Sequence, residues 1–196
     1  MPGPAKQFDP EAALAAAMEV FRARGYEAAG LNELLAAMGI GRKSLYDTFG
    51  NKRGLFLRAI DAYALGQRRA LREVLGREGS PLGNITAALE AFAREHGRPG
   101  GLGCGIGNNI ADFADDDAEV AAVLRGHLAG NEREWARAVR AAQAAGEVDP
   151  ASSATDLARL LLLTAQGSAL TARVAERPTV ELAAARSLVS LLAAKP

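Results

Sequence analysis

The chain has 196 residues with 23 basic and 23 acidic side chains, so its formal net charge is zero and gives no sign of a nucleic-acid binder. Alanine and leucine are abundant while aromatic residues make up only 5%, a composition that favours helices over strands and predicts an all-α fold. A single cysteine excludes an internal disulfide, and no apolar stretch approaches the roughly 20 residues of a membrane-spanning helix, so we expect a cytoplasmic protein without a membrane segment.

Four helices are predicted over the first 75 residues. The first begins at residues 9–11, where an aspartate N-cap is followed by proline and glutamate, and it stops at Gly25. The second is short, because the Gly39-Ile40-Gly41 turn is too tight and too rich in glycine to continue it. Hydrophobic periodicity places the four helices between residues 9 and 25, at 30–38, at 42–49 and at 52–75.

Five further helices are predicted in the rest of the chain. Ser80-Pro81 is typical of a helix start, and Asp116 with Glu119 three residues later resembles a capping box. The last two helices are apolar on broad faces that contain alanine, glycine and serine. The expected spans are about residues 80–96, 105–114, 116–146, 153–174 and 178–194.

Charge is unevenly distributed along the sequence. Residues 40–77 contain nine basic and three acidic side chains, whereas residues 100–120 contain five acidic side chains and no basic one. A cluster of like charges is most often a solvated face, so this asymmetry supports no function by itself.

Residues 31–49 have the pattern of a helix-turn-helix. Two short helices packed at a steep angle need a sharp turn, here at Gly39, and apolar residues on both inner faces, such as Leu34 and Leu45. The second helix of such a pair lies in the major groove of DNA, where its first residues reach base edges and phosphates. At the start of the next helix, free backbone N–H groups also favour a phosphate. The residues expected to line the DNA are Arg42, Lys43, Ser44, Tyr46, Thr48 and Lys52.

The segment GIGRKSLYDTFGNK, residues 39–52, closely resembles the helix-turn-helix signature of the TetR/AcrR transcription regulators. In that family a Gly-apolar turn leads to Leu-Tyr, then Phe, then Lys at these spacings, and the resemblance extends over about residues 9–60. It implies that the six residues named above line the DNA, with Tyr46 and Lys52 as phosphate anchors. Four positions depart from the family pattern and bear on the operator sequence: Gly30, Leu35, Lys43 and Thr48.

The resemblance also implies two domains, a helix-turn-helix DNA-binding domain over residues 1–55 and a helical effector-binding and dimerisation domain over residues 56–196. The protein would be a homodimer that binds a near-palindromic double-stranded DNA operator and is released by an unidentified small-molecule effector. Its last two helices would pair across the two-fold axis. Candidate effector-binding residues, each of which also suits an ordinary core or surface position, are Phe92, Cys104, Asn108, Phe113, Trp135 and Gln166.

Two other classes of protein remain open. One is a small all-α enzyme or ligand carrier whose N-terminal helices are only structural, and the other is a non-specific DNA-packaging protein. The glycine-rich residues 100–107 lack the Gly-Lys pair of a phosphate loop, and two histidines are too few for a typical metal site. We therefore expect no catalytic residues, no cofactor and no metal.

Overall fold

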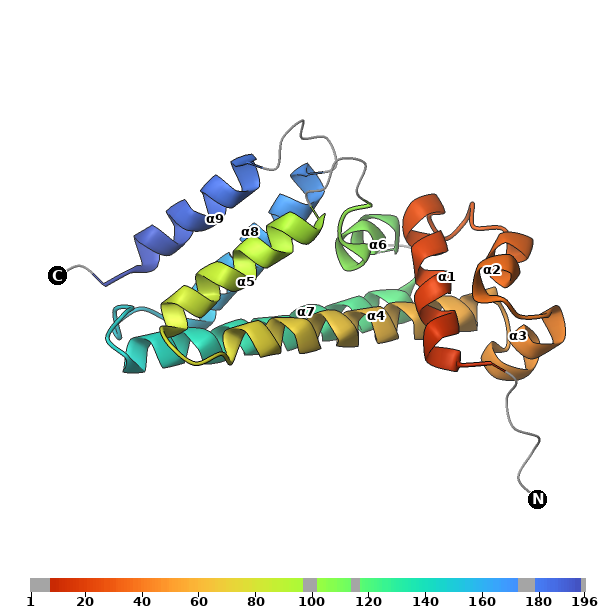
Figure 1. Ribbon diagram of the computed structural model, residues 1–196, viewed down its shortest axis with the longest axis horizontal. Helices are drawn as coiled ribbons and strands as arrows, with labels where there is room; N and C mark the ends of the chain where they lie inside the picture. The colour runs from red at the N-terminus through yellow and green to blue at the C-terminus, as the bar shows by residue number, and fades with distance from the viewer. Residues whose placement is uncertain (1–7, 97–101, 114–116, 173–178, 195–196) are drawn as a thin grey trace, which may run out of the picture. The chain divides into compact units, whose positions relative to one another are not determined.

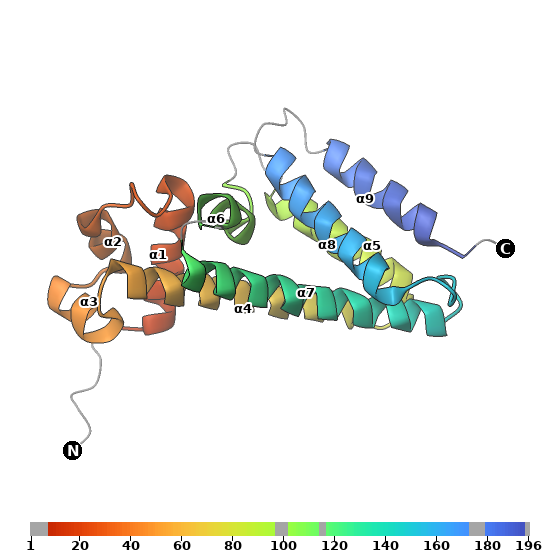
Figure 2. The ribbon, with the colours of Figure 1, turned by 180° about the vertical axis from the view of Figure 1, so that it is seen from behind.

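A computed structural model of the chain describes residues 8–96, 102–113, 117–172 and 179–194, and these residues form an all-α fold, as predicted (Figures 1 and 2). None of the helices in these ranges is long and apolar enough to cross a membrane. The helices are α1 (Pro10–Arg24), α2 (Leu31–Met38), α3 (Arg42–Phe49), α4 (Lys52–Leu75), α5 (Pro81–His96), α6 (Gly105–Phe113), α7 (Ala118–Ala144), α8 (Ala154–Thr171) and α9 (Thr179–Leu192).

The chain divides into two compact units, residues 1–65 and residues 66–196. Helix α4 contributes its first part to unit 1 and its last part to unit 2. The functional boundary predicted between residues 55 and 56 also falls within α4, and it stays a prediction.

Capping side chains begin several helices where the sequence predicts them. Asp9 Oδ1 accepts a hydrogen bond from the Glu11 N–H at 2.9 Å, and Ser80 Oγ accepts one from the Gly83 N–H at 2.9 Å. The cap of α7 is Asp117, whose Oδ1 accepts from two backbone N–H groups of the first turn. The capping box predicted at Asp116 lies outside the described residues.

The core of unit 1 is formed by α1, α2, α3 and the first part of α4, which gather around one another in Figures 1 and 2. Phe21 of α1 packs edge-on against Phe56 of α4, with 5.1 Å between the ring centroids, and Tyr26 contacts both rings. Leu34 and Leu45 are completely buried, so α2 and α3 are held by their apolar inner faces.

The core of unit 2 lies between α5, α7, α8 and α9. Trp135, Val139 and Leu161 are fully buried in it, and Leu71 and Val74 near the end of α4 pack against it. The last part of α4 therefore belongs to the packing of unit 2.

A buried carboxylate fixes the end of α4 to α7. Glu134 of α7 is only 5% exposed, and its Oε1 accepts hydrogen bonds from Arg72 Nη2 at 2.5 Å and from Arg72 Nε at 3.2 Å. Its second oxygen accepts from Arg137 at 2.6 Å. The hydrogen bond from Arg72 lowers the pKa of Glu134 below its ordinary value of 4.5, against the opposing effect of burial.

We expect Glu134→Gln to reduce the stability of unit 2 at neutral pH by about 1.5–3 kcal/mol, because the charge-assisted hydrogen bonds are lost. Since the folded-state pKa of Glu134 is depressed, its contribution is present above the pKa of the unfolded chain and disappears as the pH falls through the folded-state value. Urea unfolding measured from pH 7 down to pH 3 should therefore show a flatter acid limb for Glu134→Gln. An acid limb as steep as that of the unaltered protein would contradict this role.

Candidate functional site

The turn between α2 and α3 has the backbone that its glycines allow. Gly39 adopts the left-handed conformation, with φ 65° and ψ 29°, and its N–H donates to the Ala36 carbonyl. Gly41 is extended and occupies the N-cap of α3, which has no side-chain cap and no acidic residue in its first turn. The first N–H groups of α3 thus remain available to an anion such as a DNA phosphate.

The outer face of α3 presents most of the predicted DNA-lining residues. Arg42, Lys43 and Tyr46 are exposed, and half of the Tyr46 surface is accessible. The other three, Ser44, Thr48 and Lys52, are half-buried. Leu45 and Phe49 point into the core, as the helical spacing predicts, and they fix which face of α3 is free.

Two side chains that the sequence does not single out hold the cations of α3. Asn32 Oδ1 of α2 accepts a hydrogen bond from Arg42 Nη2 at 2.8 Å, and Asp47 Oδ2 accepts one from Lys43 Nζ at 2.5 Å. The pair between Lys43 and Asp47 has the i,i+4 spacing that a charge-pattern search identifies. The contact of Asn32 joins residues ten apart, and no local pattern reveals it.

Lys52 and Arg58 of α4 are positioned by contacts with the segments around them. Lys52 Nζ donates to the Glu27 carbonyl at 3.1 Å and lies 4.7 Å from the centre of the Tyr26 ring. An ammonium has three donors, so this hydrogen bond leaves others for a phosphate. Arg58 Nη1 donates to the Thr48 carbonyl at 2.9 Å near the C-terminal end of α3.

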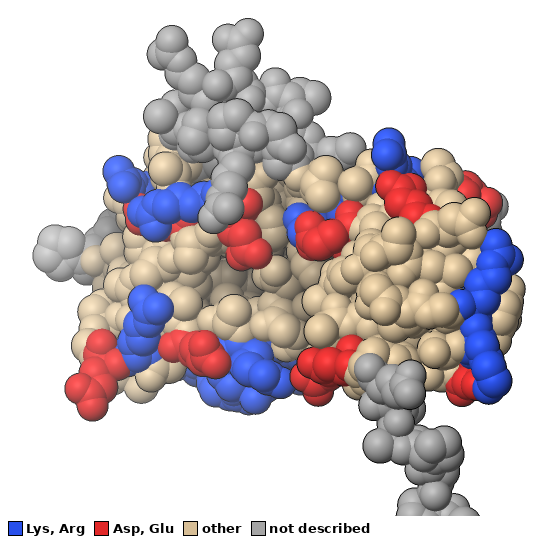
Figure 3. All heavy atoms as spheres, turned by 45° about the vertical axis from the view of Figure 1, so that its right-hand side comes forward, with Lys and Arg blue, Asp and Glu red and all other residues tan. Residues whose placement is uncertain are grey.

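Positive and negative side chains are interspersed over the face that Figure 3 shows. With a formal net charge of zero, the chain has no overall excess of positive charge to attract DNA from a distance. The predicted contact with DNA would therefore depend on the local cations at the start of α3 and α4.

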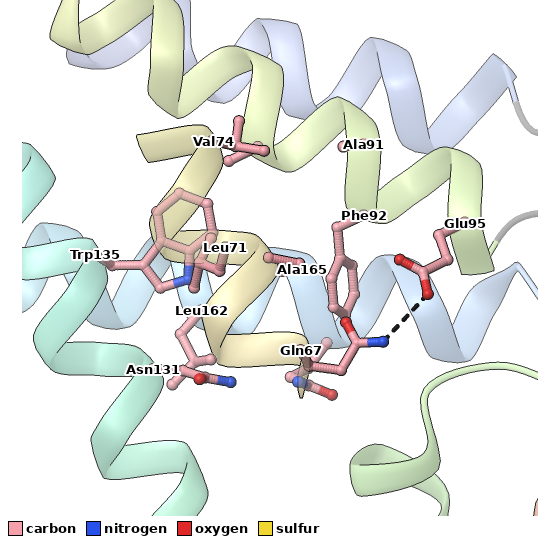
Figure 4. Close-up of a pocket in the computed structure, with 13 residues that line it drawn as sticks. Gln67, Leu71, Val74, Ala91, Phe92, Glu95, Asn131, Trp135, Leu162 and Ala165 are labelled. Carbon is pink, nitrogen blue, oxygen red and sulfur yellow. Dashed lines mark hydrogen bonds between the residues drawn. The ribbon is translucent and has the colours of Figure 1, made fainter. Parts of the chain in front are cut away.

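A first cavity, which we call the aromatic chamber, lies between α4, α5, α7 and α8 of unit 2 and has a volume of about 80 Å³ (Figure 4). Three of the predicted effector-binding residues, Phe92, Trp135 and Gln166, line it. Gln67 of α4 also lines it and donates to Glu95 Oε1 of α5 at 3.1 Å, a contact that the sequence gives no reason to expect.

A second cavity, which we call the α6–α8 groove, has a volume of about 300 Å³. Cys104 and Asn108 line it, together with Gln166, which also lines the aromatic chamber. The remaining predicted effector-binding residue, Phe113, lines neither of these cavities. The six predicted residues therefore do not form one site.

No cluster of three or more His, Cys, Asp or Glu side chains that could hold a metal ion occurs in the part of the chain that the structure describes.

Two family models match the sequence. Residues 13–59 match the model described as "Bacterial regulatory proteins, tetR family", and residues 80–188 match the model described as "Tetracyclin repressor-like, C-terminal domain". The two matches together span most of the chain.

Named regulators of bacteria match most of the chain. The HTH-type transcriptional repressor ComR of Escherichia coli (strain K12) is 34% identical over 176 residues, which are 87% of this chain and 82% of ComR. The transcriptional regulator AcuR of Cereibacter sphaeroides is 31% identical over 180 residues, 86% of this chain and 81% of AcuR. Among solved structures, a cysteine mutant of the TetR family transcriptional regulator CifR in complex with 26-base-pair operator DNA superposes with a TM-score of 0.79 at 27% identity, covering 94% of this chain and 97% of that one.

Proposed function

The chain belongs to the TetR family of bacterial regulatory proteins and is a DNA-binding transcription regulator, and we propose that it is a ligand-responsive repressor that binds a near-palindromic operator as a homodimer. The observation that carries the proposal is the exposed face of α3, which presents Arg42, Lys43 and Tyr46 in the first turns of a helix whose N-terminus has no side-chain cap. Two relatives are named as transcriptional repressors, which supports repression rather than activation. Because the family regulates bacterial transcription, we also propose that the protein acts in the cytoplasm.

The exposed leucines of unit 2 support a homodimer. Leu160, Leu163 and Leu170 of α8 are 43%, 68% and 62% exposed, and Leu191 of α9 is 83% exposed. Gly167 lies on the same side of α8 and has no atom near the position of a β-carbon, so another helix has room to approach. An apolar stripe of this kind favours a self-complementary interface, and the two recognition helices would then lie about 34–36 Å apart or a multiple of that distance.

Helix α4 supports a link between effector and operator. Leu71 and Val74 in its last part pack against the core of unit 2, and its first residue, Lys52, is one of the predicted phosphate anchors. A ligand that prefers a different position of α4 would change the placement of Lys52, and operator affinity would fall by the ligand's differential affinity for the two states.

The test is a gel-shift titration of the purified protein, at fixed near-physiological salt, against DNA from upstream of its own gene with random DNA as competitor. We expect saturable binding that survives the competitor. We expect Tyr46→Ala combined with Lys52→Ala to weaken it by about 10³-fold or more, since the homodimer would lose four phosphate contacts that are each worth on the order of 1–1.5 kcal/mol. Lys52→Ala alone should also reduce the slope of log affinity against log salt by about 2, because each subunit of the homodimer would lose one phosphate contact.

Arg125→Ala removes an exposed cation from α7 and serves as the control, which should bind the operator as the unaltered protein does. Equal affinity for operator and random DNA would instead indicate a DNA-packaging protein. If the substitutions of Tyr46 and Lys52 change neither the affinity for operator DNA nor the affinity for random DNA, the result would favour the ligand carrier or the small enzyme.

A further inference from the structure

The α6–α8 groove has the size and lining of a site for an organic molecule. Its volume of about 300 Å³ is roughly twice that of an engineered protein cavity that binds benzene. The aromatic chamber, at about 80 Å³, is smaller than that benzene-binding cavity. Leu163, Leu170 and Ile110 give the groove apolar walls, and none of the described residues that line it is charged.

One polar atom of the groove has no partner within the described part of the chain. Gln166 Oε1 is fully buried and accepts no hydrogen bond. It lies 3.0 Å from the position that a β-carbon on Gly107 would occupy, so the absence of a side chain at Gly107 gives the oxygen its space. A buried amide oxygen without a donor costs about 1–3 kcal/mol, and a ligand that supplies the donor removes this cost.

We infer that the α6–α8 groove binds an uncharged, mainly apolar organic molecule that donates a hydrogen bond to Gln166 Oε1. A carboxylate is rejected because no described residue that lines the groove is a cation, and its negative charge would face an amide oxygen in a largely apolar cavity. An ammonium group is rejected because none of the described lining residues carries a carboxylate that could replace the lost hydration. This inference rests on the proposed function, since it names the chemical class of the effector.

Equilibrium dialysis of the full-length protein with three probes of similar shape tests separately whether the ligand must be uncharged and whether it must carry a hydrogen-bond donor. 2-Naphthol is uncharged and has one donor, 2-methoxynaphthalene has no donor, and 2-naphthoate is an anion. We expect one 2-naphthol to bind per chain, at least ten-fold more tightly than 2-naphthoate and several-fold more tightly than 2-methoxynaphthalene. Gln166→Met, which keeps the length of the side chain but removes the amide oxygen, should abolish the preference for 2-naphthol over 2-methoxynaphthalene.

Two further variants locate the bound probe. Gly107→Leu places a side chain in the groove beside Gln166 Oε1 and should abolish 2-naphthol binding, whereas Ala91→Phe adds a ring to the lining of the aromatic chamber and should leave 2-naphthol binding unchanged. Cys104, the only cysteine, lines the groove, so bound 2-naphthol should slow its modification by a thiol reagent.

Absence of saturable binding, equal binding of 2-naphthoate, or loss of binding in Ala91→Phe but not in Gly107→Leu would each overturn the inference. Dialysis uses no DNA, so a negative result here leaves the gel-shift test of operator binding intact. Conversely, failure of the gel shift with successful dialysis would retain the groove as a ligand site and remove the proposed regulation.

Discussion

Gly54→Ala is expected to destabilise unit 1 by about 1–3 kcal/mol or more and to abolish operator binding at 37 °C. Gly54 lies in the first turn of α4, and a β-carbon there would be 2.2 Å from the carbonyl oxygen of Phe49, the last residue of α3. Because the opposing atom belongs to the backbone, relief requires α3 and α4 to separate. The recognition helix would then move away from its place over the core.

The control for this substitution lies in the same helix. Gly66 is exposed, and no atom lies within 4 Å of its β-carbon position. Gly66→Ala should therefore stabilise α4 by about 0.5–1 kcal/mol, through the higher helix propensity of alanine. Thermal unfolding followed by circular dichroism should show the two variants shifting in opposite directions, with a fall of roughly 10 °C for Gly54→Ala. A stable Gly54→Ala protein that binds operator normally would contradict the close packing of α3 on α4.

The helix limits of this protein follow from local chemistry, which is why the sequence predicts them well. A cap such as Asp9 or Ser80 acts on N–H groups two or three residues away, and Gly25 ends α1 with a φ of 77° that other residues rarely adopt. Helices α7 and α9 end at Ala144 and Leu192, two residues before their predicted limits. The predicted end of α8, at residue 174, lies outside the described residues.

The DNA-facing side of α3 is also predictable, because periodicity assigns Leu45 and Phe49 to the core and so leaves Arg42 and Tyr46 outside. The contacts that orient these side chains cannot be predicted from the sequence. Arg42 meets Asn32 across the turn, and the space that Gly54 provides matters only because of the angle at which α4 leaves α3. Such contacts depend on tertiary geometry rather than on sequence spacing.

The two cavities are even less predictable from sequence spacing than these contacts. Aromatic and polar residues on inner helix faces are recognisable, and five of the six predicted effector-binding residues line a cavity. Their division between two cavities is not recognisable, because a cavity is the volume that several distant helices leave unfilled. Gly107 illustrates this, since its role is to leave room for an oxygen of Gln166, 59 positions further along the chain.

Leu163→Arg is expected to convert the proposed dimer to a monomer and to lower operator affinity by about 10³-fold or more, toward the level of non-specific binding. Leu163 is 68% exposed in the middle of the apolar stripe of α8. In a dimer formed through this stripe, the introduced guanidinium would lose its hydration and would face the guanidinium of the other subunit. Analytical ultracentrifugation and gel shift measure the two effects. Leu65→Arg, at a leucine of α4 that is 47% exposed and outside the stripe, is the matched control and should remain dimeric. If Leu163→Arg stays dimeric while Leu65→Arg dissociates, the subunits do not meet through α8, and the spacing of the two recognition helices must be set by another surface.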